Sequence, residues 1–168
     1  MFIAGAIGSI LPDADVIGFK LGVPYASTFG HRGFTHSIVF AVVVSAILLL
    51  ITRPQRRLAA FAFLFICTMS HALFDAMTTG GLGIAFFSPF SNHRYFFPWR
   101  PIRVSPIGAA SLQRLLPVLV SELTWVWLPM FSAAFSAAFS AAIVRRLLPG
   151  TSRTAAPAEA RPPRSPRP

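Results

Sequence analysis

Charged residues are scarce in this chain of 168 residues, and acidic ones are the scarcest. Only 12% of the residues are charged, with 5 Asp and Glu against 15 Lys and Arg, whereas 54% are hydrophobic. A soluble globular domain has roughly 25% charged residues, so this chain has too few to cover the surface of one. The abundance of apolar residues also excludes a chain that is disordered throughout. The sequence instead predicts a small helical membrane protein.

Cysteine and lysine are nearly absent. The single cysteine, Cys67, cannot form a disulfide within the chain, so the cysteine count indicates no redox compartment. The net charge of +10 is almost entirely arginine, and a basic balance can indicate nucleic acid, a membrane surface or membrane topology. The arginines flank apolar segments, and the Arg-rich end of the chain lacks interleaved aromatic residues. We therefore expect the charge to set topology and do not expect nucleic acid as a partner.

Four apolar segments predict three to four membrane helices in an all-α fold. They are Phe2–Leu11, Ile38–Ile51, Leu58–Met77 and Leu115–Val144. The first is shorter than the about 20 residues that span a bilayer, and we interpret it as the last part of a helix. Pro117 and Pro129 interrupt the last segment, so we expect its spanning part near residues 123–144. A Phe-Ser-Ala-Ala repeat that starts at Phe131 places small residues at every fourth position, which favours close helix packing in lipid.

The remaining segments complete the predicted organisation. Residues 78–114 are rich in Gly, Pro and aromatic side chains and show no helical period, so we expect a loop. Residues 149–168 are rich in Pro, Arg, Ala and Ser, which predicts a disordered tail. The helical membrane domain then covers residues 1–148, with its polar groups gathered at one end.

Ionisable groups are costly inside a membrane, so the few that occur there point to function. The first group is Leu11-Pro-Asp-Ala-Asp15. Pro12 predicts a helix end, and in an extended segment the two carboxylates lie on one side. Two like charges held together favour a bound cation. An exposed acidic turn is the alternative for this motif taken alone.

Histidines form the second and third groups. His31-Arg-Gly-Phe-Thr-His-Ser37 places two imidazoles at the mouth of an apolar run, and Thr35 is a candidate cap for the helix that follows. His71 and Asp75 share a helix face, so they can bind one ion, or Asp75 can orient His71 from behind. Without a metal, the first motif would be a hydrogen-bonded histidine pair at the membrane interface, and the second would form a single interhelical hydrogen bond.

These three groups converge at one membrane depth. His36 lies 17 residues, about 25 Å of helix, before the arginine turn at 53–57, and His71 lies 14 residues, about 21 Å, after it. Both histidines are therefore opposite that turn, where Asp13 and Asp15 end the first apolar segment. Asp and His from three separate stretches predict a divalent metal site with nitrogen and oxygen ligands.

A fourth segment, Ser88-Pro-Phe-Ser-Asn-His-Arg94, supplies hydroxyl groups, a histidine and an arginine. Taken alone it is a plain loop. Beside a metal, it can contact an anionic substrate, because a guanidinium makes bidentate contacts with phosphate.

Together these motifs resemble the YdjM-type family of inner-membrane, metal-dependent hydrolases, which includes LexA-regulated members. The resemblance covers roughly residues 5–105 and is carried by Leu11-Pro-Asp-Ala-Asp15, His31–Ser37, His71 with Asp75, Thr79-Gly-Gly81, and Ser88–Ser91 with Arg94. That family is similar to zinc-dependent phospholipase C and P1-type nucleases, which are helical enzymes that cleave phosphodiesters. The resemblance implies a metal set of Asp13, Asp15, His31, His36, His71 and Asp75. Family members usually carry a further histidine upstream, which this chain lacks, so we expect either an incomplete chain or fewer bound metals.

We accordingly predict a membrane-bound hydrolase that uses a metal-activated water. The cofactor is a divalent metal, zinc foremost, with manganese or magnesium as alternatives. His31 serves as a ligand or a base, and Arg32 or Arg94 stabilises charge on a phosphoryl oxygen. A site at the bilayer surface suggests a lipid or lipid-linked phosphoester as substrate.

A non-catalytic membrane protein that binds or transports a metal ion is the alternative function. A transport path needs polar groups along its whole depth, and Ile38–Ile51 contains only Ser45. The positive-inside rule places the arginine turn at 53–57 and the flank at Arg145 and Arg146 in the cytoplasm. We therefore predict a multi-pass inner-membrane protein whose Asp and His site faces the outer side of that membrane.

Overall fold

The computed structural model describes residues 1–104 and 112–147, without the side chains of 112–114, and all regular elements in these ranges are helices. This confirms the predicted all-α fold class. The described chain divides into two compact units, one covering Met1–Leu128 and one starting at Pro129. The predicted disordered tail, residues 149–168, and the domain boundary at 148 lie outside the described residues.

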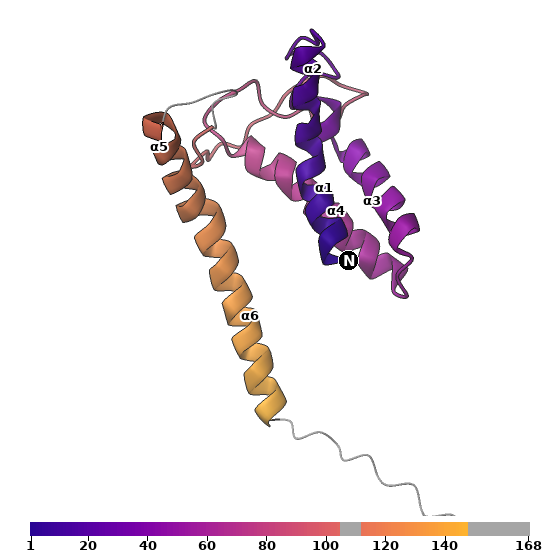
Figure 1. Ribbon diagram of the computed structural model, residues 1–168, viewed down its shortest axis with the longest axis vertical. Coiled ribbons are helices and arrows are strands. Elements are labelled where there is room, and N and C mark those ends of the chain that lie inside the picture. Colours follow the sequence, from indigo (N-terminus) through magenta and orange to yellow (C-terminus); the bar gives the residue numbers. More distant parts are fainter. Residues whose placement is uncertain (105–111, 148–168) are drawn as a thin grey trace, which may run out of the picture. The chain divides into compact units, whose positions relative to one another are not determined.

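Three helices form the core of the first unit: α1 (Phe2–Ile10), α3 (Ile38–Thr52) and α4 (Arg57–Ala76), which pack against one another (Figure 1). Two glycines allow α1 to approach α4 closely. A Cβ atom on Gly5 would lie 2.9 Å from a ring carbon of Phe63, and one on Gly8 would lie 2.6 Å from the Thr68 hydroxyl. Small residues at this interface let the two backbones pack without the help of a hydrophobic effect between helices.

The helical hairpin of α3 and α4 forms as predicted. Ser37 begins α3 by accepting the Phe40 N–H at 3.1 Å, and Arg53 ends it in a left-handed conformation with φ of 43°. The expectation that Thr35 caps this helix is wrong, because Ser37 is the residue directly before the helix and its side chain forms the cap. The turn between α3 and α4 lies at the opposite end of the bundle from α2 and the long loops (Figure 1).

The first apolar segment continues further than its composition predicts. A 3-10 helix, η1 (Leu11–Val16), follows α1, and a short helix, α2 (Ile17–Lys20), follows η1. Pro12 sits in the first turn of η1, where the fixed φ of proline is compatible with a helix. The helical path of 19 residues, Phe2–Lys20, is therefore long enough to cross a membrane, and the two carboxylates lie on a 3-10 helix instead of an extended segment.

By length and composition, three helical stretches of the described chain can cross a membrane: Phe2–Lys20, Arg57–Ala76 and Leu115–Leu147. The hydrophobic α3 is shorter, at 15 residues. Large apolar side chains on the hairpin remain exposed in the isolated chain, with Leu50 at 73% and Leu58 at 83%. Such surface is typical of a protein whose solvent is lipid.

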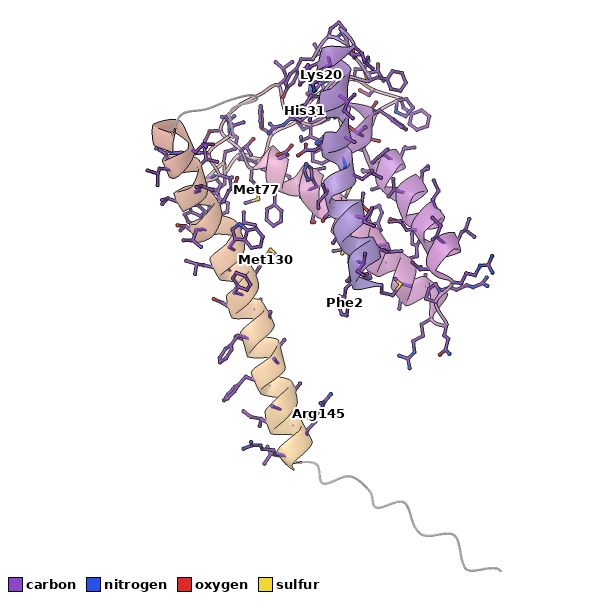
Figure 2. The ribbon with its side chains drawn as sticks, viewed as in Figure 1. Phe2, Lys20, His31, Met77, Met130 and Arg145 are labelled. Carbon is purple, nitrogen blue, oxygen red and sulfur yellow. The ribbon has the colours of Figure 1, made fainter. Side chains whose placement is uncertain are left out.

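The last apolar run contains α5 (Leu112–Glu122), a five-residue π-helix η3 (Leu123–Trp127) and α6 (Leu128–Leu147). Pro117 lies inside α5, and η3 comes directly before the segment that contains Pro129, where a π-turn can absorb the lost backbone hydrogen bond. None of the described side chains of α6, among them Met130 and Arg145 (Figure 2), is buried. The predicted packing role of the Phe-Ser-Ala-Ala face stays a prediction.

The loop residues 78–104 cover the end of α4. Two isolated bridges order them, between Thr78 and Ile102 and between Ile84 and Tyr95. Ile84 is fully buried and joins Ala72 and Ala76 of α4 in the hydrophobic core. This packing holds the loop directly over the part of α4 that carries His71 and Asp75.

Candidate metal centre

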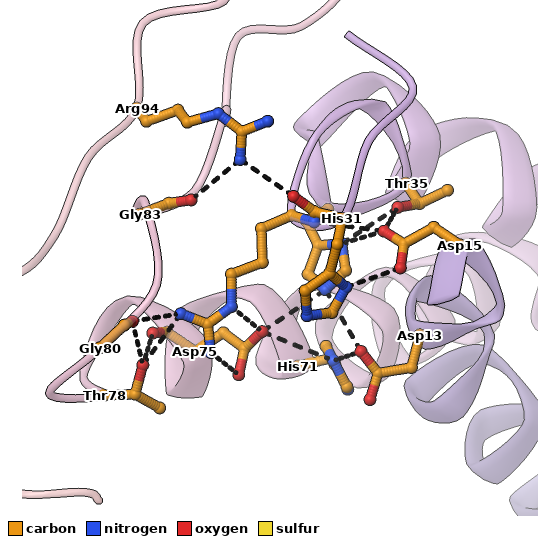
Figure 3. Close-up of polar contacts among 12 residues, drawn as sticks. Asp13, Asp15, His31, Thr35, His71, Asp75, Thr78, Gly80, Gly83 and Arg94 are labelled. Carbon is orange, nitrogen blue, oxygen red and sulfur yellow. Dashed lines mark hydrogen bonds and ion pairs between the residues drawn. The ribbon is translucent and has the colours of Figure 1, made fainter. Parts of the chain in front are cut away.

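The Asp and His residues predicted from the sequence come together in space (Figure 3). They come from three regions: η1 carries Asp13 and Asp15, the loop and short 3-10 helix before α3 carry His31 and His36, and the end of α4 carries His71 and Asp75. The described residues form two groups that could hold an ion, which share His36. One consists of Asp13, His36, His71 and Asp75, and the other of Asp15, His31 and His36.

The first group has the geometry of a four-ligand metal site. The Nε2 atom of His71 lies 3.2 Å from Asp13 Oδ1, and the Nε2 atom of His36 lies 3.6 Å from Asp13 Oδ1 and 3.5 Å from Asp75 Oδ2. A tetrahedral zinc ion with bonds of about 2.1 Å separates its ligand atoms by about 3.4 Å. The observed distances are close to this spacing.

The two imidazoles also have open ligand atoms. The Nε2 atoms of His36 and His71 are buried and have no hydrogen-bond partner. Buried polar nitrogens are seldom left without a partner, and an ion at this point would provide one for both. Two imidazole nitrogens and two carboxylate oxygens suit a divalent ion of borderline or hard character. These residues therefore fit the expected divalent metal.

Asp15 lies behind the histidines and makes contacts of a different kind. Its Oδ1 atom accepts from His31 Nδ1 at 2.7 Å, and its Oδ2 atom accepts from the Thr35 hydroxyl at 2.5 Å and from the Arg32 backbone N–H at 3.2 Å. The side chain is only 2% exposed. The same Oδ2 lies 3.3 Å from His36 Nδ1, on the side of that ring away from the open Nε2.

Asp13 and Asp15 point to different partners because η1 is a 3-10 helix. With three residues per turn, side chains two positions apart project in different directions. Asp13 faces the open nitrogens of His36 and His71, while Asp15 faces the Nδ1 atoms of His31 and His36. A carboxylate that fixes the far nitrogen of an imidazole is a common support for a metal-binding histidine.

His31 lies outside the four-residue group and belongs to the second group, with Asp15 and His36. Its Nδ1 is bound to Asp15, and its ring packs edge-on against Tyr25 at 5.4 Å and against His36 at 5.5 Å between centroids. The ring also lines the cavity beside the site. An imidazole held in this way has one nitrogen fixed by a carboxylate and the other available to a substrate or water.

Arg32 is buried, and its guanidinium contacts Asp75 and the loop that follows α4. Its Nε and Nη2 atoms contact the two carboxylate oxygens of Asp75 at 3.0 and 3.1 Å, and its Nη1 donates to the Thr78 hydroxyl and the Gly80 carbonyl at 3.0 and 2.8 Å. This bidentate pair fixes the carboxylate of Asp75. The arginine therefore ties the end of α4 to the loop that follows it.

The guanidinium of Arg94 is also hydrogen-bonded within the protein. Its guanidinium donates to the carbonyls of Tyr25, Ser27 and His31 at 3.0 to 3.2 Å, and to that of Gly83 at 3.4 Å. It links the loop before α3 with the loop 78–104, and it does not line the cavity. The roles predicted for Arg32 and Arg94 at a phosphoryl group stay predictions.

The carboxylates around His36 dominate its electrostatics. Burial by itself lowers the pKa of His36, but Asp13, Asp15 and Asp75 outweigh burial and raise this pKa to about 10. The side chain is fully buried. A site that holds a buried imidazole in its cationic form is a site of negative potential, which also attracts a metal cation.

A cavity of about 680 Å³ opens beside the four-ligand group. Its apolar wall is formed by Val16, Phe74, Ile102, Val104, Val126 and Trp127. Besides His31 and His71, its charged and titratable lining includes Asp13, Asp75, Arg32, Arg103 and Glu122. Arg103 and Glu122 could not be predicted as site residues from the sequence, because nothing in their spacing connects them with the Asp and His motifs.

Comparisons with known proteins agree with this architecture. The family model for the YdjM inner membrane protein matches residues 1–147. Inner membrane protein YbcI of Escherichia coli (strain K12) is 45% identical over 134 residues, which cover 77% of this chain and 78% of that protein. Uncharacterized protein YvsG of Bacillus subtilis (strain 168) is 32% identical over 93 residues, which cover 51% of this chain and 56% of that protein. No solved structure matches the chain.

Proposed function

The chain belongs to the YdjM family of inner membrane proteins, and from this premise we propose that it is a metal-dependent hydrolase of lipid-borne phosphodiesters. One observation carries the proposal. Two buried, unpartnered imidazole nitrogens face two carboxylates at the wall of a cavity, and a carboxylate-bound histidine lines the same cavity. The first part is a metal-binding arrangement, and the second is a base beside it.

Asp13, His36, His71 and Asp75 would hold one divalent ion, with zinc as the first candidate and manganese or magnesium as alternatives. When bound, such an ion lowers the pKa of a water molecule to about 7 and polarises a phosphoryl oxygen. Asp15 then acts as a positioning residue, because it holds the far nitrogens of His31 and His36. Arg32 positions Asp75 through the bidentate contact.

His31 is the group that moves the proton. Its Nδ1 stays bound to Asp15, so its other ring nitrogen accepts the proton as the water oxygen bonds to phosphorus. The ester P–O bond breaks, and the departing alkoxide oxygen takes a proton from the His31 imidazolium. The buried Asp15 carboxylate stabilises that imidazolium while it carries the charge.

The lining of the cavity favours a lipid phosphodiester. With a divalent ion bound and neutral imidazoles, the lining has a net charge of +1, because the ion and two arginines outweigh three carboxylates. This charge complements a phosphodiester, which carries one negative charge. The apolar wall can accommodate part of an acyl or isoprenoid chain.

We further propose that the site faces the outer side of the inner membrane. The arginine turn at 53–57 lies at the other end of the bundle from the site (Figure 1), and the positive-inside rule favours the cytoplasm for that turn. Single cysteines at Gln55 and Asn92, in a Cys67→Ala background, test this with a membrane-impermeant thiol reagent. We expect position 92 to be labelled in spheroplasts. Labelling of position 92 only after the membrane is broken would reject this orientation.

The activity is tested with protein purified in detergent and supplied with zinc or manganese. We expect hydrolysis of phosphodiester lipids by the wild type and by His93→Ala, an exposed histidine outside the site. Asp75→Asn should lose at least about a hundredfold in rate, since it removes a ligand oxygen and the Arg32 contact. Thermal melting of both variants separates loss of catalysis from loss of folding. A wild type that binds the ion but hydrolyses no faster than Asp75→Asn would contradict catalysis and favour the metal-binding alternative.

A further inference from the structure

The arginines in and around the cavity differ in how far their donors are occupied. Arg32 places its guanidinium against Asp75, Thr78 and Gly80, so few of its donors remain for a ligand. Arg103 lines the same cavity, is exposed, and makes no side-chain hydrogen bond or ion pair within the described ranges 1–104 and 115–147. Among the residues that the structure describes, it is therefore the cavity-lining cation whose side chain has no hydrogen-bond or ion-pair partner.

We propose that Arg103 binds the anionic phosphate group of the substrate. This inference rests on the proposed function, and it assigns phosphate recognition to a residue outside the Asp and His motifs. A guanidinium offers five N–H donors in a planar fork that matches two phosphate oxygens. Arg103 thus takes the role that the sequence alone suggested for Arg32 or Arg94.

The backbone around Arg103 is anchored, so its side chain extends from a fixed position. The Arg103 N–H donates to the Ser121 hydroxyl at 3.0 Å. Ile102 is 4% exposed, and its N–H and carbonyl bond to Met77 and Thr79 at 3.2 and 2.9 Å. These contacts join the Arg103 segment to the loop that begins at the end of α4. A substrate group bound by Arg103 is therefore held at a defined place relative to Asp75.

Glu122 is the acidic residue of the cavity lining that lies outside the metal-binding group. No ion pair within 4.0 Å joins it to Arg103 in the described chain, so it leaves the Arg103 donors open. Val126 and Trp127 follow Glu122 on η3 and supply apolar surface to the same cavity. A phosphate attached to a lipid would use both surfaces, whereas free phosphate would use Arg103 without the apolar wall.

Binding without turnover tests this inference. The full chain in detergent, with and without zinc, is titrated with inorganic phosphate and with dihexanoyl phosphatidylglycerol. Tryptophan fluorescence reports binding, because Trp127, one of the three tryptophans of the chain, lines the cavity. Arg103→Gln should lower the affinity for both ligands by roughly 10- to 100-fold, which is the range expected for the loss of one charge-assisted hydrogen bond. Arg103→Lys should restore part of the loss because it keeps the charge without the fork.

Arg100→Gln is the matched control. Arg100 is exposed, stacks on Phe96 at 4.7 Å and does not line the cavity, so its loss should change affinity by less than about twofold. Unchanged binding by Arg103→Gln would overturn the inference, and so would an equal loss in Arg100→Gln. A loss for inorganic phosphate alone would keep Arg103 as an anion contact and exclude the lipid as its source.

Failure of this inference is distinct from failure of the proposed function. If hydrolysis occurs, Arg103→Gln should raise KM for the phosphodiester by roughly tenfold or more while the zinc content stays at the wild-type level. An active enzyme with unchanged KM and phosphate affinity in Arg103→Gln refutes the role of Arg103 only. An inactive wild type refutes the hydrolase, and the phosphate titration still decides whether Arg103 binds anions.

Discussion

Replacing Asp15 by Asn tests whether this carboxylate orients the rings of His31 and His36 through their Nδ1 atoms or binds the ion itself. Asp15 is almost completely buried and accepts hydrogen bonds from His31, Thr35 and the Arg32 backbone. The amide keeps the shape but replaces one accepting oxygen by a donating NH2 group. At least one of these donors then faces another donor, and His31 and His36 are held less firmly.

The expected magnitude follows from the position of Asp15. Loss of a carboxylate that orients a metal-binding histidine lowers metal affinity by about 10- to 100-fold, or about 1.4 to 2.7 kcal/mol. Asp15→Asn should therefore still bind one ion, with a higher Kd. Asp13→Asn should bind far more weakly, because its Oδ1 lies between the open nitrogens of His36 and His71.

A zinc titration against a chromophoric chelator, in detergent and well below the melting temperature, measures both affinities. Thr35→Val is a milder companion variant that removes the hydrogen bonds of the Thr35 hydroxyl to Asp15 and to His36 Nδ1 without removing the carboxylate. We expect the order of affinity to be wild type, Thr35→Val, Asp15→Asn and then Asp13→Asn. If Asp15→Asn and Asp13→Asn lose zinc equally, Asp15 is a ligand and the reasoning is refuted; unchanged affinity in Asp15→Asn refutes it as well.

Three further predictions concern packing, protonation and the loops. Gly8→Val should separate α1 from α4 and lower stability by about 1 to 3 kcal/mol in detergent melting, whereas Ala6→Val on the exposed face of α1 should have little effect. Because the pKa of His36 is raised from 6.5 to about 10, the ion-free protein keeps this stabilisation below pH 6.5 and loses it as the pH rises through about 10. Its melting temperature should fall over that interval, and zinc binding, which displaces the proton, should tighten; a flat profile in both measurements would contradict the assigned charge. Arg94→Gln should expose the loops around residues 25–31 to limited proteolysis, since it removes bonds to three carbonyls there, while Arg100→Gln should be cleaved like the wild type.

The helical hairpin and the meeting of the histidines could be predicted because both depend on helix rise. Counting residues from the arginine turn at 53–57 placed His36 and His71 at one depth, and their rings lie 5.1 Å apart in the structure. Burial of polar groups in apolar helices pointed to the same residues. The inner-membrane family, the all-α class and the convergence of the Asp and His motifs are thus encoded in local pattern.

Other features depend on tertiary structure and could not be read from the pattern. The different directions of Asp13 and Asp15 follow from a 3-10 helix where an extended segment was expected. Arg32 and Arg94 looked available for a substrate because their partners, among them Asp75 and the Tyr25 carbonyl, lie far away in the sequence. Arg103 becomes a candidate phosphate contact only because the structure shows Arg32 and Arg94 bonded to groups within the protein.

The metal content of the purified protein shows whether Asp13, His36, His71 and Asp75 bind one divalent ion, as we propose. The protein is equilibrated with buffered zinc in detergent and analysed by elemental mass spectrometry for the wild type, His71→Ala and the control His93→Ala. We predict one ion per chain in the wild type and in His93→Ala, and loss of the ion in His71→Ala. A wild type without stoichiometric metal, or a His71→Ala variant that retains it, would contradict the account.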